Sequence, residues 1–250
     1  MKPYKVSEPL LFIHTPKAGG TTARTVVRSW FPDNFHEHYF DEVKGTLPEK
    51  ISPFGLHTEN NPLVIYGHFN KRRGFGIEDY YPEVNQFVTI LRDPFELTVS
   101  SYYYTRAKSE KWKEKPASLN VGLEDYILST EVNMLNHFPR EVHLDNFREI
   151  IQDYFIYIGI TEDLSQSLRN IGHLLNRKPP RRVGIENRTP RTSEVDPELR
   201  KLFREKHLLE YEVYEYVKSL HESAGQLGRS SLFAGLKRLL SPKRTGERLD

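Results

Sequence analysis

The stretch LLFIHTPKAGGTTARTVVRSWF, residues Leu10–Phe31, decides the fold of this chain. It runs from an unbroken apolar segment, which predicts a short buried strand, through a Pro-Lys-Ala-Gly-Gly turn into a helical pattern that begins near Thr21 or Thr22. A glycine-containing turn between a strand and a helix directs backbone N–H groups and the positive end of the helix dipole toward one point. Lys17 adds a positive charge, and the threonines add hydroxyl donors. The stretch therefore predicts a binding loop for phosphate or sulfate.

The order of residues in this loop separates it from the nucleotide-triphosphatase loop. There the lysine follows the last glycine, whereas Lys17 precedes Gly19 and Gly20. A nucleotide kinase or ATPase with an unusual phosphate loop stays open as an alternative, and it would need magnesium and a carboxylate ligand. Asp93 is the obvious candidate ligand, but the proline after it indicates a helix cap instead. A tight turn with a solvated lysine is the competing structural interpretation.

Composition limits the protein class. With 250 residues, of which 37% are apolar, the chain can bury the core of one domain, which we expect over residues 1–222. The 36 basic and 34 acidic residues lack the excess of a general nucleic-acid binder, so we expect no nucleic-acid partner. Zero cysteines exclude disulfides, thiolate catalysis and cysteine-based zinc sites. With no signal-peptide core and no run near the roughly 20 apolar residues of a membrane span, we expect a soluble cytoplasmic protein.

Further strands and helices follow from the same patterns. Apolar runs that end in polar residues predict buried strands at 62–68, 85–94 and 154–164. Helical patterns run over 95–113, from a cap at Thr161 to about 176, and from Asp196-Pro197 to 222. The alternation predicts an α/β fold with a central, mostly parallel sheet flanked by helices, whose strand ends line a ligand crevice.

The C-terminal segment, residues 223–250, is predicted to be a basic amphipathic tail. Apolar residues at helical spacing lie beside basic ones: Leu232, Phe233, Leu236, Leu239 and Leu240, with Lys237 and Arg238. Peripheral contact with a membrane surface or a partner is one interpretation. A last helix packed on its own domain, with a frayed end, is the other.

A second motif, ILRDPFELTVSSYYYTR, lies at residues 90–106. A buried strand delivers Arg92, and Ser100 follows about two helical turns later. Arginine presents a planar fork of donors to phosphate oxygens, so the pair can hold a phosphate. The alternative for Arg92 is an ion pair with a helix residue, and the three consecutive tyrosines are typical of a packed helix with one solvated face.

Together the two motifs resemble those of the sulfotransferases, particularly the carbohydrate enzymes related to heparan sulfate 2-O- and 6-O-sulfotransferases. FIHTPKAGGTT is similar to the loop that binds the donor 5′-phosphosulfate, and the segment from Arg92 to Ser100 to the site of its 3′-phosphate. The resemblance implies a P-loop-like fold, the donor 3′-phosphoadenosine 5′-phosphosulfate (PAPS), its product adenosine 3′,5′-bisphosphate (PAP), an acceptor hydroxyl and no required metal. It implies these donor contacts: Lys17, Ala18, Gly19, Gly20, Thr21, Thr22, Arg92, Ser100, Arg188 and Thr189.

The resemblance also implies catalytic roles. Lys17 would neutralise charge on the departing phosphate oxygen, and His68, after the strand at 62–68, would be the base that takes the acceptor proton. A buried histidine satisfied by backbone bonds is the alternative for His68. Some 2-O relatives carry a histidine where this chain has Tyr66, and many relatives carry a second arginine where it has Leu97. These departures weaken a 2-O assignment and put a structural pairing in doubt.

The acceptor is predicted to be a carbohydrate or glycan. Candidate acceptor contacts are the basic segment after His68 and a polar segment further on: Lys71, Arg72, Arg73, Asn136 and His137. Arginine pairs with carboxylate or sulfate, although a charged surface turn is the alternative. The loop carrying Arg188 and Thr189 is either a nucleotide contact or solvated. A non-catalytic module that binds sulfated or phosphorylated glycans also stays open.

Overall fold

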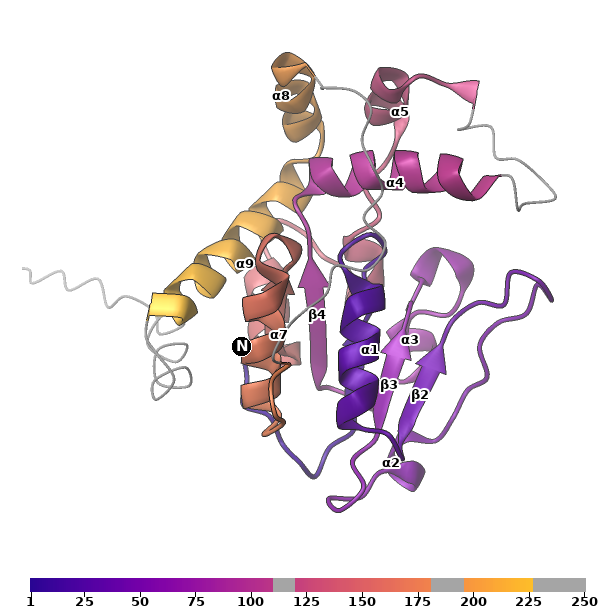
Figure 1. The fold of residues 1–250 in the computed structure, drawn as a ribbon, viewed down its shortest axis with the longest axis vertical. Coiled ribbons are helices and arrows are strands. Elements are labelled where there is room, and N and C mark those ends of the chain that lie inside the picture. Colours follow the sequence, from indigo (N-terminus) through magenta and orange to yellow (C-terminus); the bar gives the residue numbers. More distant parts are fainter. Residues whose placement is uncertain (110–119, 181–195, 227–250) are drawn as a thin grey trace, which may run out of the picture.

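A computed structural model describes residues 1–109, 120–180 and 196–226. Its centre is a five-stranded parallel sheet in the order β2-β3-β1-β4-β5 (Figure 1). The strands are β1 (Leu10–Ile13), β2 (Phe35–His38), β3 (Val64–Gly67), β4 (Phe87–Leu91) and β5 (Phe155–Ile160). The predicted α/β class, with a central parallel sheet flanked by helices, is confirmed.

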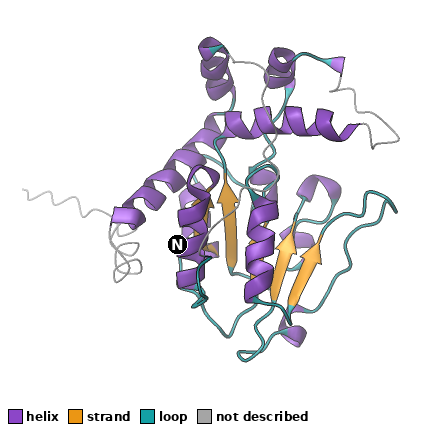
Figure 2. Ribbon diagram, viewed as in Figure 1, coloured by secondary structure: helices purple, strands orange, loops and turns teal. Residues whose placement is uncertain are grey.

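Helices connect the strands and cover both faces of the sheet (Figure 2). The α-helices are α1 (Gly20–Trp30), α2 (Pro53–Leu56), α3 (Ile77–Tyr80), α4 (Pro94–Lys108), α5 (Leu123–Ser129), α6 (Phe147–Tyr154), α7 (Leu164–Leu174), α8 (Pro197–Lys206) and α9 (Leu208–Gln226). Short 3₁₀ helices lie at η1 (Lys71–Arg73), η4 (Leu135–His137) and η5 (Thr161–Asp163). Helices α4, α5 and α8 lie beyond the carboxyl ends of the strands (Figure 1).

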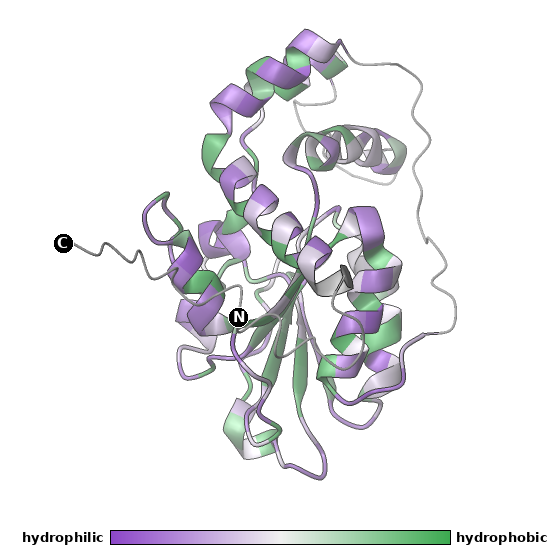
Figure 3. Ribbon diagram, turned by 90° about the vertical axis from the view of Figure 1, so that its left-hand side faces the viewer, coloured by the Kyte–Doolittle hydropathy of each residue, from purple (hydrophilic) through white to green (hydrophobic). Residues whose placement is uncertain are grey.

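Two apolar clusters, one on each face of the sheet, form the core. In β1, Leu10 and Phe12 belong to the cluster under α1 and α7, while Leu11 and Ile13 belong to the cluster under α4, α6 and α9. Successive strand residues point to opposite faces, so a strand covered on both sides must be apolar throughout. Figure 3 shows hydrophobic strands in the middle of the sheet and helices of mixed hydropathy.

The structure adds one strand and corrects two sequence predictions. The sequence analysis did not predict β2, whose segment FHEH pairs in parallel with β3 at the sheet edge. The single helix expected from Asp196 to 222 is two helices, because α8 ends at Lys206 and α9 starts at Leu208. The cap of α7 is Asp163, whose side chain accepts from the Gln166 N–H, rather than Thr161.

Some predicted features lie outside the described residues. These are Arg188, Thr189 and the tail beyond residue 226. Among the residues that the structure does describe, no helix has the length and apolar character needed to cross a membrane. The same part of the chain contains no cluster of three or more histidine or carboxylate side chains arranged to hold a metal ion.

Candidate functional site

The loop between β1 and α1 presents its backbone at the start of the helix. Lys17 and Gly19 both have left-handed backbones, with φ of 65° and 76°. Gly19 is the residue that caps α1, and within the described ranges no side chain caps the helix there. The first N–H groups of a helix lack partners within it, so they are available to an anion. Tyr66 Oη donates to the Gly20 carbonyl oxygen at 2.7 Å and fixes the helix start.

Gly20 is required by a close approach rather than by its backbone angles. A Cβ atom at this position would lie 1.8 Å from ring atoms of His14. The imidazole is held there by Tyr39, whose hydroxyl lies 2.9 Å from Nδ1 of His14. The His14 N–H donates to the Gly67 carbonyl oxygen at 2.8 Å, which ties the loop to β3. The His14 ring therefore packs against the first residue of α1.

Arg92 brings the second motif to the first. It follows β4, and its Nη1 donates to the Lys17 carbonyl oxygen at 3.0 Å. Its Nη2 lies 4.0 Å from a carboxylate oxygen of Glu96, so the helix ion pair considered from sequence is present as well. Ser100 lies two turns into α4 and is partly exposed. The structure therefore places Arg92 against the loop that carries Lys17.

The ammonium of Lys17 is in an unusual environment. Its Nζ lies 3.6 Å from the centre of the Tyr104 ring, a cation–π contact between the loop and α4. Burial lowers the pKa of Lys17 to about 8, and the positive charges of Arg92 and Lys108 act in the same direction. An anion bound at this position would therefore relieve both a desolvation cost and repulsion between cations.

Three imidazoles pack together beside the loop. The rings of His14 and His68 have centroids 4.6 Å apart, and those of His68 and His137 are 5.8 Å apart. Each histidine comes from a different segment: the end of β1, the end of β3 and η4. Within the described chain, Nε2 of His68 is buried without a hydrogen-bond partner.

Burial keeps these imidazoles neutral. It lowers the pKa of His68 to about 4, with a smaller contribution from Arg73 and an opposing one from Glu42. Burial lowers the pKa of His137 to about 3, and the His68 ring adds to this effect while the Phe69 carbonyl opposes it. The pKa of His14 is also well below its usual value, mainly through burial. A neutral imidazole can accept a proton, so His68 has the protonation state of a base at neutral pH.

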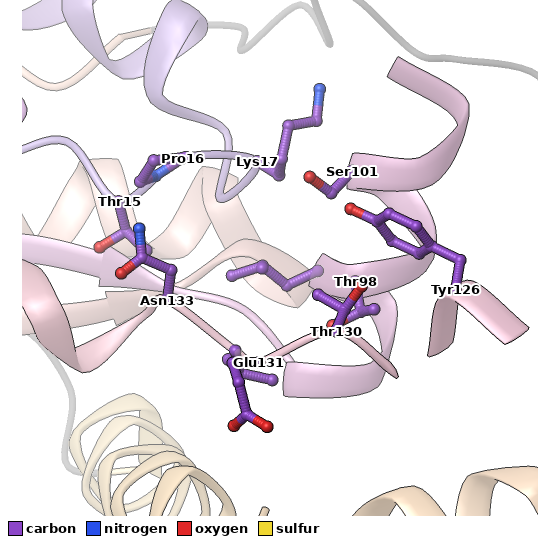
Figure 4. A pocket seen from close by; sticks show the side chains of 11 residues that line it. Thr15, Pro16, Lys17, Thr98, Ser101, Tyr126, Thr130, Glu131 and Asn133 are labelled. Atoms are coloured by element: carbon purple, nitrogen blue, oxygen red, sulfur yellow. The ribbon is translucent and has the colours of Figure 1, made fainter. Parts of the chain in front are cut away.

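A pocket of about 230 Å³ opens beside the loop, between α4 and the segment after α5 (Figure 4). Its lining residues are Thr15, Pro16, Lys17, Leu97, Thr98, Ser101, Tyr126, Thr130, Glu131, Val132 and Asn133. Thr15 and Asn133 connect the pocket to the imidazoles, since Thr15 follows His14 and Asn133 precedes η4. Because Thr15, Pro16 and Lys17 follow the end of β1, the pocket lies at the carboxyl ends of the strands, where open parallel sheets bind ligands.

The residues predicted to contact the acceptor lie in η1 and η4, rather than among the residues described as lining the pocket. Asn136 donates to Asn70 Oδ1 at 2.7 Å, which joins η4 to the residue before η1. Two basic residues of η1 form ion pairs: Lys71 lies 3.5 Å from Glu78, and Arg73 lies 2.7 Å from Glu42. The residues of η1 and η4 are not in the described lining of the pocket.

The sequence analysis missed several residues that shape the site. Tyr39 positions His14, and Tyr104 lies under the Lys17 ammonium. Tyr104 was interpreted from sequence as part of a packed helix, and at 38% exposure it faces both solvent and Lys17. Ser101, Tyr126 and the 130–132 segment were not singled out either. The one available signal was the run of hydroxyl side chains in α4, whose outward face a sequence does not identify.

No protein-family model matches this sequence, and no curated protein matches it. Solved structures that resemble its fold include two sulfotransferases. Mouse sulfotransferase SULT7A1 complexed with PAP aligns over 80% of this chain and 63% of its own, at 13% identity and a TM-score of 0.39, so this chain spans less than two thirds of its length. A sulfotransferase from Alicyclobacillus acidocaldarius aligns over 84% of this chain and 96% of its own, at 13% identity and a TM-score of 0.41. At these values neither neighbour identifies the activity or ligands of this chain.

Proposed function

We propose that this chain is a PAPS-dependent sulfotransferase that acts on a hydroxyl group of a carbohydrate or glycan. One observation carries the proposal: Arg92 is hydrogen-bonded to the carbonyl oxygen of Lys17, in the loop before α1. The motifs that resemble a 5′-phosphosulfate loop and a 3′-phosphate site thus meet at one edge of the sheet. Two anion-binding groups so close together suit a nucleotide with phosphates at both positions.

The residues present fit such a donor. The uncapped N–H groups of α1 and the hydroxyls of Thr21 and Thr22 would hold the 5′-phosphate. Lys17 would neutralise charge on the bridging oxygen as it leaves, and its desolvated ammonium favours an anionic neighbour. Arg92 and Ser100 would hold the 3′-phosphate. Arg188 and Thr189, outside the described residues, stay predictions for the same ligand.

His68 is the proposed base. As the acceptor oxygen forms its bond to sulfur, the bond from sulfur to the 5′-phosphate oxygen breaks, and the acceptor proton passes to the imidazole. Nε2 of His68 lacks a partner among the described residues, so it is the nitrogen available for this proton. It is enclosed in the structure, and catalytic hydrogen bonds commonly form only once substrate is bound. The pKa near 4 keeps the ring neutral at physiological pH.

Asp93, the candidate magnesium ligand of the kinase alternative, has other partners in the structure. The Asp93 carboxylate accepts from the Glu96 N–H at 3.0 Å as the cap of α4, and Arg200 lies 3.5 Å from it. A carboxylate committed to a helix start and an arginine is poorly placed to bind magnesium.

Calorimetric titration with adenosine 3′,5′-bisphosphate tests the proposal, with ATP and magnesium as the parallel ligand. We expect metal-independent binding of the bisphosphate, lost in Arg92→Ala. Binding of ATP only in the presence of magnesium would overturn the proposal in favour of a kinase. Binding of a labelled glycan that survives loss of both Lys17 and His68, without bisphosphate binding, would favour the non-catalytic module.

A further inference from the structure

We propose that the pocket beside Lys17 binds the acceptor, and that this acceptor is an uncharged sugar or polyol unit rather than an acidic or sulfated glycan. The inference rests on the proposed function and specifies its substrate class. It depends on three features of the pocket: the chemistry of its polar groups, its balance of charge, and its size and position.

The polar groups that reach the pocket are neutral. Figure 4 shows the hydroxyls of Ser101 and Tyr126 pointing toward the space beside Lys17, while the amide of Asn133 lies near Thr15. Oδ1 of Asn133 is buried and lacks a hydrogen-bond partner among the described residues. A buried acceptor atom without a partner is costly, and a ligand hydroxyl that donates to it would remove that cost. Hydroxyl and amide groups of this kind match the hydroxyls of a sugar.

The charges in the lining do not suit an anionic acceptor. Lys17 is the one cation in the described lining, and the donor is proposed to engage it. Glu131 is the one carboxylate there, and it lies 3.0 Å from Lys206. Its carboxylate points away from the other lining groups in Figure 4. Recognition of a carboxylate or sulfate calls for arginine or lysine in contact with it, so an anionic acceptor would lack a dedicated partner here.

The volume and the walls suit one sugar ring. About 230 Å³ is below the range of roughly 300–1,000 Å³ typical of pockets for drug-sized ligands. Leu97, Val132 and Pro16 supply apolar surface against which the C–H face of a ring can pack. The pocket therefore admits a single unit, such as the end of a chain or a free sugar.

The position of the pocket is suited to transfer. Thr15 follows His14, Asn133 lies four positions before His137, and the rings of both histidines contact His68. A hydroxyl held between Thr15 and Asn133 would lie in the same pocket as Lys17, and the neighbouring histidines contact the proposed base. Within the described residues, the pocket thus adjoins Lys17 and is linked to His68 through His14 and His137, which lie near its lining residues in sequence.

An acceptor panel gives the first test. With PAPS as donor, kcat/KM is measured for neutral saccharides and for saccharides of equal length that carry uronic acid or sulfate, each at two salt concentrations. We expect the neutral acceptors to be preferred at least tenfold, with little dependence on salt. A preference for the anionic acceptors that weakens as salt rises would overturn the inference.

Variants of the lining give the second test. Tyr126→Phe and Ser101→Ala each remove one hydroxyl, and we expect each to raise KM for the neutral acceptor by about 3- to 10-fold, the usual worth of one hydrogen bond. Ser129→Ala in α5 is the matched control, because its hydroxyl donates to the Asp125 carbonyl oxygen and lies outside the pocket. Unchanged KM in both lining variants would contradict the inference.

Bisphosphate affinity, measured on the same proteins, separates the two proposals. If wild-type protein fails to bind the bisphosphate, the proposed function itself is wrong. If binding is intact in every variant while acceptor use is unaffected or anion-selective, only the assignment of the pocket fails.

Discussion

Arg92 donates a hydrogen bond from Nη1 to the carbonyl oxygen of Lys17 at 3.0 Å, across 75 positions of sequence. The bond holds the backbone of the anion loop at a residue whose φ is 65°, a conformation that a residue other than glycine rarely adopts. One arginine therefore has two tasks. It supports the loop, and we propose that its guanidinium also contacts the 3′-phosphate of the donor.

Because of this double role, Arg92→Ala is expected to weaken bisphosphate binding by about 10- to 100-fold, the usual cost of losing hydrogen bonds to a charged group. Arg92→Lys keeps the charge but not the planar fork, so it should recover only part of the affinity. Arg200→Ala is the control, because it removes the ion pair with Glu96 without touching the loop. Calorimetry measures all three, and equal losses in Arg92→Ala and Arg200→Ala would contradict the assignment.

The pKa of Lys17, about 8, predicts an alkaline limit to activity. Its ammonium is present below that pH and is lost above it, so kcat/KM for the donor should fall as pH rises past about 8. Lys17→Arg should move this limb to higher pH, since a guanidinium stays protonated. A pH profile of kcat/KM for both proteins makes the comparison. An alkaline limb still near pH 8 in Lys17→Arg would show that another group titrates.

His68→Ala is expected to lower turnover by about 10²- to 10⁴-fold while bisphosphate affinity stays within a few fold, because the base acts on the acceptor. In the wild type, the neutral base is present above the pKa of about 4 and is lost below it, so an acid limb should lie near that pH. His143→Ala, at an exposed position, is the control. A parallel loss of bisphosphate binding in His68→Ala would assign the ring a structural role.

Substitutions of the two loop glycines should lower the stability of the protein for different reasons. Gly20→Ala would place a methyl group 1.8 Å from the His14 ring, so the ring must leave Tyr39 and the protein should lose about 1–3 kcal/mol of stability. In Gly19→Ala, the new Cβ atom would meet only side-chain atoms of Leu164, the nearest at 3.1 Å, but the backbone φ there is 76°. We therefore expect a loss of about 1–2 kcal/mol of stability. Gly122→Ala, whose nearest atom is 3.8 Å away, is the control. Urea unfolding ranks the three, and equal stability of Gly20→Ala and Gly122→Ala would disprove the close packing.

Buried neutral histidines predict acid sensitivity. The pKa values of His38 and His68 are lowered to about 4 and that of His137 to about 3, chiefly by burial. Their full contribution to stability is present above the unfolded pKa near 6.5 and is lost as pH falls toward 4, because the unfolded chain binds the protons first. Each imidazole should contribute a slope of up to about 1.4 kcal/mol per pH unit.

Urea unfolding between pH 7 and 4 measures this dependence. His38→Gln should reduce the slope by one imidazole, and the exposed His143→Gln should leave it unchanged. A slope in His38→Gln equal to that of the wild type would mean that carboxylates, rather than histidines, set the acid limit.

The sequence predicted four of the five strands because each is covered on both faces, which leaves an apolar run. The edge strand β2 has no such run, since FHEH is only partly buried and is defined by backbone pairing with β3. The break between α8 and α9 was hidden for a different reason. His207 is compatible with a helix, but its ring packs 4.3 Å from Phe203 and its backbone leaves the helical range. Tertiary packing decided both.

The candidate site divides in the same way. The anion loop and Arg92 could be found because each is a short motif in which spacing along the chain reflects spacing in the fold. The Lys17 contact with Tyr104 and the pocket wall from 130–133 could not, because they depend on how α4 and the segment after α5 lie over the sheet. Sequence patterns do not determine how such elements pack over one another.

The place of β1 within the sheet has a consequence for the chain as it is made. Leu11 pairs with Ile65 of β3 on one side and with Phe87 of β4 on the other, so both neighbours come from later sequence. On a ribosome, the strand that leads into the anion loop keeps an open edge until β4 has emerged. Unpaired apolar edges can recruit other chains, so during the interval between synthesis of β1 and of Leu91 the nascent chain is exposed to aggregation.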